Sequence, residues 1–134
     1  LDASRSRLFA GYRTARELER VATEAAEIAR AVEHLEPAPS TELVDEIRAV
    51  GEAACEAVET ATDTVTDGGS PATAQRASDR AAAATEHARA LQRTVAEEQP
   101  TDAILLARVI DSVRHTARSA ETLGEIALQR SVRQ

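Results

Sequence analysis

Apolar residues recur at alternating steps of three and four along most of this sequence, and no other feature constrains its fold as strongly. In the first long block the repeating positions are Leu18, Val21, Ala25, Ile28, Val32 and Leu35. The same steps run from Leu43 to Val65, from Ala74 to Val95 and from Leu106 to Ala127. Positions with this spacing share one face of an α-helix, so the pattern predicts four amphipathic helices.

Three short segments rich in proline, glycine and serine interrupt the apolar pattern and place the helix boundaries. They are EPAPS (36–40), DGGSP (67–71) and QPT (99–101). The predicted helices therefore span about residues 6–36, 40–67, 71–98 and 101–131. Because the connections are short, sequential helices are expected to be antiparallel. The predicted fold is all-α, a single domain over residues 1–134 built as an antiparallel bundle of four long helices.

Each interruption also contains residues that favour the start of a helix. Serine and threonine side chains accept hydrogen bonds from the first backbone N–H groups, and proline suits the first helical position. The predicted starts are Ser40 or Thr41, Ser70 followed by Pro71, and Thr101.

The composition limits what the core of such a bundle can contain. Apolar residues make up 43% of the chain, but Phe9 and Tyr12 are its only aromatic residues. The core must therefore consist of alanine, valine, leucine and isoleucine, which favours closely packed helices over a sheet. Cys55 is the single cysteine, which excludes an intrachain disulfide. Its place beside the apolar stripe predicts a buried small hydrophobic side chain.

The charge is acidic and unevenly distributed. The net charge is −7, and all 16 basic residues are arginine. The segment from Ser40 to Gly68 contains eight acidic residues and one arginine, a net charge of −7 (one minus eight). Acidity argues against direct nucleic-acid binding, which needs a basic surface, and is typical of proteins from a salt-rich cytoplasm. No apolar run is long enough to predict membrane insertion, so the expected location is the cytoplasm.

Two distant segments, Ala15–Leu35 and Ala107–Ala127, repeat one another at a constant offset of 92 residues, the difference between 107 and 15. The matched pairs are Leu18 with Ile110, Val21 with Val113, and Ala25 with Ala117. If the two segments occupy equivalent places in the bundle, both members of each pair should face inward.

The first copy of this phrase, ARELERVATEAAEIAR, resembles the last helix of a PhoU repeat. The resemblance implies one three-helix repeat preceded by the last helix of another repeat. The acidic composition is closest in character to the PhoU region of haloarchaeal AbrB–PhoU regulators. Membership would imply a non-enzymatic regulator of phosphate uptake or phosphate signalling. Such a domain acts by docking to a protein partner: a transporter, a sensor kinase or an attached DNA-binding domain.

The resemblance also implies candidate ligands for a divalent metal ion. PhoU relatives often bind metals through two acidic residues four positions apart, which share one helix face. Glu19 matches the first acidic position in the first copy, and Thr23 occupies the second. In the second copy Asp111 matches the acid, and His115 stands four residues later. Asp111, His115 and Glu19 are therefore the candidate metal ligands, and a solvated helix pair is the alternative.

Two further functions fit the same pattern. One is a PhoU-like regulatory module of a potassium transport protein, and the other is a simple dimerising bundle that forms a homodimer. An enzyme is not expected, because no glycine-rich phosphate loop and no nucleophile–histidine–acid set is visible. The flanking sequence of the parent gene would separate the two regulatory alternatives.

Overall fold

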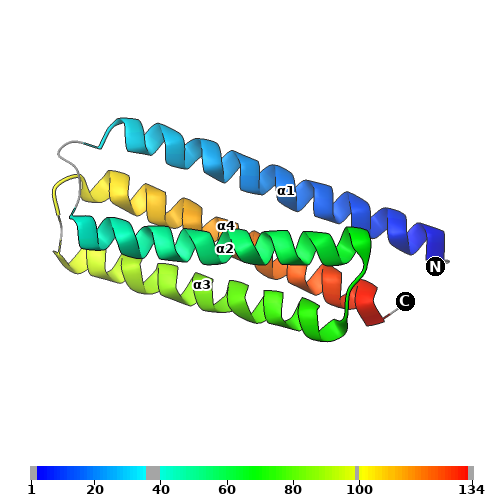
Figure 1. Cartoon of the computed structure of the whole chain (residues 1–134). Helices are drawn as coiled ribbons and strands as arrows, with labels where there is room; N and C mark the ends of the chain where they lie inside the picture. Colours follow the sequence, from blue (N-terminus) through cyan, green and yellow to red (C-terminus); the bar gives the residue numbers. More distant parts are fainter. Residues whose placement is uncertain (1–2, 36–39, 99, 133–134) are drawn as a thin grey trace.

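The computed structural model describes residues 3–35, 40–98 and 100–132, and Figure 1 shows them as a bundle of long helices. The helices are α1 (Ala3–Glu33), α2 (Thr41–Asp67), α3 (Pro71–Glu98) and α4 (Ala103–Val132). No strand occurs in the described ranges, so the predicted all-α bundle is confirmed. None of these helices combines the length and the apolarity that crossing a membrane would require.

The helix limits lie close to those predicted from the sequence. The helix α1 begins at Ala3, three residues earlier than expected, and its regular part ends at Glu33. The other three helices start and stop within two residues of the predicted positions. The predicted breaks at 36–39 and at Gln99 lie outside the described residues.

Two of the three predicted helix starts are confirmed. The Ser40 hydroxyl accepts a hydrogen bond from the backbone N–H of Leu43 at 3.2 Å. The Ser70 hydroxyl accepts one from the backbone N–H of Thr73 at 3.1 Å, and Pro71 opens α3.

The start predicted at Thr101 is wrong, because α4 begins two residues later. The residue before α4 is Asp102, whose carbonyl accepts the hydrogen bond from Leu106 N–H. Asp102 has a φ of 64°, and aspartate tolerates this left-handed region better than most residues do. The preceding turn, closed by a 3.0 Å bond from Ala103 N–H to Pro100 C=O, displaces the start from Thr101.

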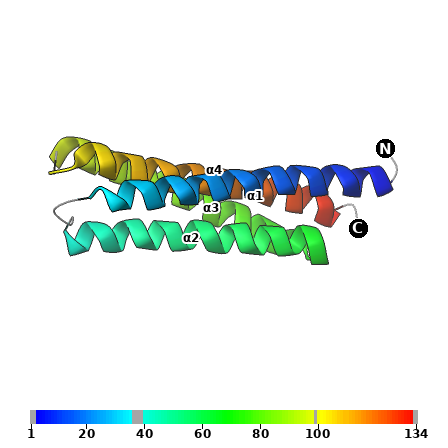
Figure 2. The same cartoon turned by 90° about the horizontal axis from the view of Figure 1, so that it is seen from above.

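The helix α4 is the centre of the bundle. It packs against each of the other three helices, and α2 and α3 also pack against each other. The helix α1 lies along α4, touches α2 only at a few places, and forms one edge of the molecule (Figures 1 and 2). The fold is thus a compact three-helix unit, α2–α4, with a fourth helix laid on α4.

The core of the three-helix unit contains the predicted apolar stripes, and on α4 it also contains Leu123 and Ile126, which lie outside the predicted stripe. The largest fully buried side chains are Leu106, Ile110, Leu123, Ile126 and Val50. The stripe of α3 is mostly alanine and is buried along its whole length, from Ala74 to Val95. Small side chains let α3 and α4 approach closely. At Gly124 an added Cβ would lie 2.9 Å from the Cα atom of Ser78.

The stripe predicted for α1 is only partly correct. Its members Ile28 and Leu35 are half-buried, but Leu18 and Val32 are 37% and 52% exposed. The buried positions of α1 are instead Ala10, Thr14, Glu17 and Ala31. Because α1 is covered by essentially one helix, it presents a narrow and partly polar face to α4. Apolar side chains of α1 such as Leu18 and Val32 therefore remain exposed to solvent.

The two copies of the repeated phrase do not occupy equivalent environments. Ile110 and Ala117 are fully buried at 1% and 0% exposure, whereas the matched Leu18 and Ala25 are exposed. The expectation that both copies face inward is therefore wrong at these positions. The reason is the neighbours, because α4 is surrounded by three helices and α1 packs mainly against one.

Candidate functional site

Two of the clefts beside α1 concern the candidate functional residues. One is polar and lies between α1 and α4. The other is apolar and lies between α1 and α2, with α4 as its floor. Both arise because α1 rests on α4 without closing against the remaining helices.

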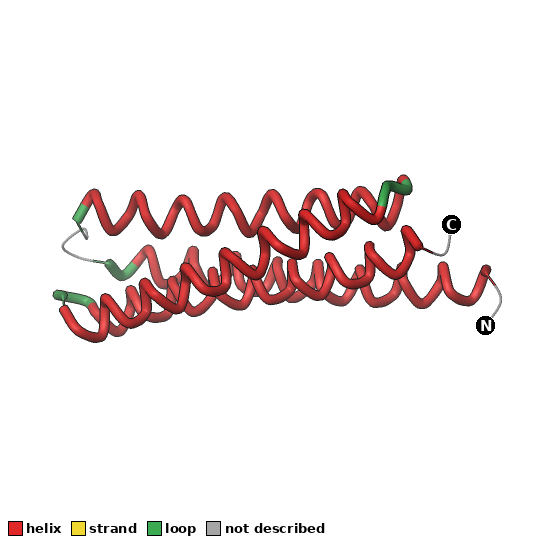
Figure 3. The backbone as a smooth tube through the Cα atoms, turned by 90° about the horizontal axis from the view of Figure 1, so that it is seen from below, coloured by secondary structure: helices red, strands yellow, loops and turns green. Residues whose placement is uncertain are grey.

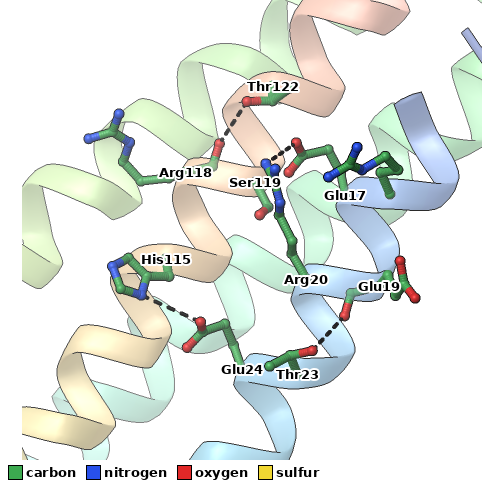
Figure 4. Close-up of a pocket in the computed structure, with 10 residues that line it drawn as sticks. Glu17, Glu19, Arg20, Thr23, Glu24, His115, Arg118, Ser119 and Thr122 are labelled. Atoms are coloured by element: carbon green, nitrogen blue, oxygen red, sulfur yellow. Dashed lines mark hydrogen bonds and ion pairs between the residues drawn. The ribbon is translucent and has the colours of Figure 1, made fainter. Parts of the chain in front are cut away.

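The polar cleft has a volume of about 480 Å³ and is lined by charged and hydroxyl side chains. The helix α1 lines it with two arginines and three glutamates, because polar residues fill the side of this helix that borders α4. The ionisable residues are Arg16, Glu17, Glu19, Arg20, Glu24, His115 and Arg118. Ser119, a buried hydroxyl residue of α4, also lines this cleft (Figure 4).

His115 connects the two helices within this cleft. Its Nδ1 atom lies 3.5 Å from a carboxylate oxygen of Glu24 on α1, and Figure 4 shows these side chains facing each other. Its Nε2 atom lies 3.8 Å from the carboxylate of Asp111, one turn earlier on α4. The predicted Asp111–His115 pair is thus brought together. Glu24 is the partner that sequence analysis missed, because contacts between helices depend on how α1 lies on α4.

Asp111 is also held by neighbours outside this pair. Its Oδ1 atom accepts hydrogen bonds from Arg114 at 2.8 Å and from Gln92 of α3 at 3.2 Å. Partial burial opposes ionisation, but these hydrogen bonds and the charges of His115 and Arg114 outweigh it. The pKa of Asp111 is consequently lowered from its usual value of 3.8.

The lowered pKa of Asp111 gives stability a defined pH dependence. The ionised carboxylate contributes stability above the unfolded-state pKa, and this contribution disappears as the pH falls through the folded-state pKa. We expect the free energy of unfolding of Asp111→Asn to be lower than that of the wild type above roughly pH 5, and the difference to fade below about pH 4. Urea denaturation at several pH values measures this. A difference that stays constant with pH would contradict it.

Glu19, the third candidate metal ligand, does not join the pair. Figure 4 shows its carboxylate directed away from His115, although the residue borders the cleft. Within residues 3–35, 40–98 and 100–132, no three histidine, cysteine or acidic residues gather as a metal ion would require. Asp111 already shares one oxygen with Arg114 and Gln92. A divalent metal bound by Asp111 and His115 stays a prediction from the sequence.

The apolar cleft, called the α1/α2 groove below, has a volume of about 440 Å³. Its α1 wall consists of Ile28, Val32 and Leu35; its α2 wall of Val44, Ile47, Gly51 and Cys55; its floor of Leu106, Val109 and Val113. On each wall the side chains are spaced three or four residues apart. The groove therefore runs along the helices, and its apolar lining is of the kind that binds the apolar face of another helix.

Cys55 and Gly51 distinguish this groove from the core. The prediction that Cys55 is buried is wrong, because its side chain is exposed on the α2 wall. An added Cβ at Gly51 would meet no atom within 4 Å. Apolar residues reach this side of α2, yet no described helix covers them.

The α2 wall carries the negative charge predicted from the sequence. All eight acidic residues of α2 are exposed, and Glu52 and Arg48 border the groove. One of the eight, Glu56, forms an ion pair with Arg80 of α3 at 3.1 Å. The groove is therefore apolar inside and bounded by an acidic helix on one side.

No family model, curated protein or solved structure matches this chain. The resemblance to the PhoU family thus rests on the phrase ARELERVATEAAEIAR in α1 and on its repeat in α4, and it stays a prediction.

The two clefts differ in what they can do chemically. In the polar cleft, Arg20 pairs with Glu17 at 2.8 Å, and Glu24 lies 3.5 Å from His115. The α1/α2 groove instead offers uncovered apolar surface with an acidic border. Binding an amphipathic helix is the chemistry that this surface favours.

Proposed function

We propose that this protein is a non-enzymatic regulatory module of the PhoU-like type, which acts by docking a helix of a partner protein in the α1/α2 groove. The proposal includes no catalytic step. In a phosphate uptake or phosphate signalling regulator the partner would be a transporter, a sensor kinase or an attached DNA-binding domain.

The observation that carries the proposal is the uncovered apolar groove. Recognition of an amphipathic helix uses apolar anchors at i, i+3, i+4 and i+7, and the groove walls present apolar side chains at this spacing. Large apolar surfaces left uncovered on a folded protein commonly mark interaction sites. The exposed acidic residues of α2 favour a partner helix with arginine or lysine on the side that faces α2.

The way α1 is attached supports a regulatory role. The helix α1 is attached partly through polar side chains such as Glu17 and Glu24, whereas the core of the three-helix unit is mainly apolar. Since α1 forms one wall of the groove, a small movement of α1 would change the width of the groove. A ligand or partner that prefers one position of α1 would shift the population toward it.

Filling the groove tests the proposal. Because an added Cβ at Gly51 meets no atom within 4 Å and points into the open groove, the ring of Gly51→Phe should occupy the groove and leave the fold intact. The probe is a labelled synthetic helix with leucine at i, i+3, i+4 and i+7 and arginine beside this stripe. Fluorescence anisotropy should show binding to the wild type and at least about tenfold weaker binding to Gly51→Phe, since about 1.4 kcal/mol corresponds to tenfold.

Two controls make the result specific. Gly51→Ala adds a methyl group only and should bind the probe like the wild type. A second probe with glutamate in place of arginine should bind more weakly than the first, because α2 is acidic. Equal binding of the first probe to the wild type and Gly51→Phe would reject the groove as the docking site.

A further inference from the structure

A second apolar stripe runs along α1 and is separate from the face that α1 buries. It consists of Leu8, Gly11, Ala15, Leu18, Ala22, Ala25, Ala29 and Val32, at strictly alternating steps of three and four. All eight positions are exposed in the structure. A repeat of 3.5 residues sustained over this length is the seam of a two-helix coiled coil, yet no described helix covers it.

The exposed apolar surface of the protein is concentrated on this helix. Among the described residues, five of the seven exposed large hydrophobic side chains belong to α1: Leu8, Phe9, Tyr12, Leu18 and Val32. Leu8 is the most exposed of these at 75%. The N-terminal turns of α1 also project past the turn between α2 and α3, where another molecule can reach them (Figures 1 and 3).

We propose that the α1 stripe is a homodimer interface in which α1 pairs with α1 of a second copy, antiparallel, about a two-fold axis near Arg20. In this register the two residue numbers of each facing pair add up to 40. The pairs are Leu8 with Val32, Gly11 with Ala29, Ala15 with Ala25, and Leu18 with Ala22 of the second copy. Each leucine meets a smaller side chain, so the two seams can interdigitate at close range.

The charges of α1 favour the antiparallel direction. The half from Ala3 to Arg20 contains five arginines and two glutamates, a net charge of +3 (five minus two). The half from Val21 to Glu33 contains one arginine and three glutamates, a net charge of −2 (one minus three). Antiparallel pairing places the positive half beside the negative half of the second copy, whereas parallel pairing places like charges together.

The size of the stripe suits a weak dimer whose population depends on protein concentration. From Leu8 to Val32 the stripe is about 37 Å long at 1.5 Å per residue, and a helix is about 10 Å wide. Covering it on two copies buries roughly 740 Å² in total (two times ~37 Å by ~10 Å), which is the size of a weak, transient interface. Leu8, Leu18 and Val32 supply the larger apolar contacts. The stripe shares only Val32 with the α1/α2 groove, so the two proposals can fail independently.

A charge placed in the middle of the stripe tests the interface. Ala22→Glu puts a carboxylate opposite Leu18 of the second copy, at a position that is exposed in the monomer and should not disturb its fold. Sedimentation velocity over a range of protein concentrations should show a dimer for the wild type and at least tenfold weaker association for Ala22→Glu. The matched control is Ala83→Glu on the exposed side of α3, which should dimerise like the wild type.

Disulfide trapping tests the direction and the register. Cys55 is first replaced by alanine, and Leu8→Cys and Val32→Cys are then introduced into separate chains. Mixing the two variants under oxidising conditions should give a covalent heterodimer, whereas Leu8→Cys alone should not link to itself. Linking of Leu8→Cys to itself would show a parallel pair and overturn the proposed register. A wild-type chain that stays monomeric at all concentrations, or equal effects of Ala22→Glu and Ala83→Glu, would overturn the interface.

Discussion

Replacing Gly124 with valine is expected to cause a large loss of stability, about 3 kcal/mol or more, because it forces α3 and α4 apart. A Cβ atom at this position would lie 2.9 Å from the Cα atom and 3.1 Å from the backbone nitrogen of Ser78. These neighbours are backbone atoms of a helix and cannot rotate away. The higher helix propensity of valine offsets only a few tenths of a kcal/mol. Thermal denaturation followed by circular dichroism should show a lower melting temperature by ~10 °C.

Gly51 is the matched control, because it is also a glycine within a helix. An added Cβ at Gly51 meets no atom within 4 Å, so Gly51→Ala should stabilise the protein by roughly 0.5–1 kcal/mol through helix propensity alone. If Gly124→Val melted at the wild-type temperature, α3 and α4 would not approach as closely as the structure shows. Opposite signs for the two substitutions would support the close contact at Ser78.

Leu91→Ala should produce the second large effect, a loss of about 2–5 kcal/mol in the free energy of unfolding. The Leu91 side chain is 4% exposed and packs in one cluster with Val50, Leu106 and Ile110. Apart from Val95, the other buried apolar residues of α3 are alanines. Truncation of Leu91 therefore removes one of only two large anchors of this helix and leaves a cavity that neighbouring alanines cannot fill.

Chemical denaturation with urea measures the loss, and Ile104→Ala is its control. Ile104 is 75% exposed at the start of α4, so its truncation should change the free energy of unfolding by less than about 0.5 kcal/mol. A loss well under 1 kcal/mol for Leu91→Ala would place this side chain outside the core and contradict the packing of α3.

Much of the architecture was predictable because it depends on local sequence. The helix limits follow from the breaks and from caps such as Ser40 and Ser70, whose hydroxyl groups bond to backbone N–H groups three residues later. The inward faces of α2, α3 and α4 follow from apolar periodicity, since each of these helices has at least two neighbours. The acidic surface of α2 follows from composition, because unpaired charges remain in water.

The surroundings of α1 could not be predicted in the same way. Apolar residues occur around much of this helix, and the predicted stripe combined residues of two faces. Ile28 and Leu35 are half-buried, whereas Leu18 and Val32 belong to the exposed stripe. Which face is buried depends on where α4 lies. The exposure of Cys55 has the same origin, because it reflects a helix neighbour that α2 lacks on that side.

The candidate sites also contain both predictable and unpredictable features. The Asp111–His115 pair was predictable, because residues four apart on one helix always share a face. Other features of the sites could not be predicted, because they depend on how the helices pack and on side-chain conformation. These are the contact of Glu24 with His115, the contacts of Arg114 and Gln92 with Asp111, and the α1/α2 groove.

By itself the sequence determined four helices, their ends to within three residues, the apolar faces of the three-helix unit and the negative charge of α2. The tertiary structure alone decided that α4 is central, that α1 packs through a mixed face of apolar and polar side chains, and that apolar surface on α1 and α2 remains uncovered. The physical reason is that backbone hydrogen bonds and capping act over three or four residues. Burial of a helix face is instead a property of its neighbours, and those lie tens of residues away in the chain.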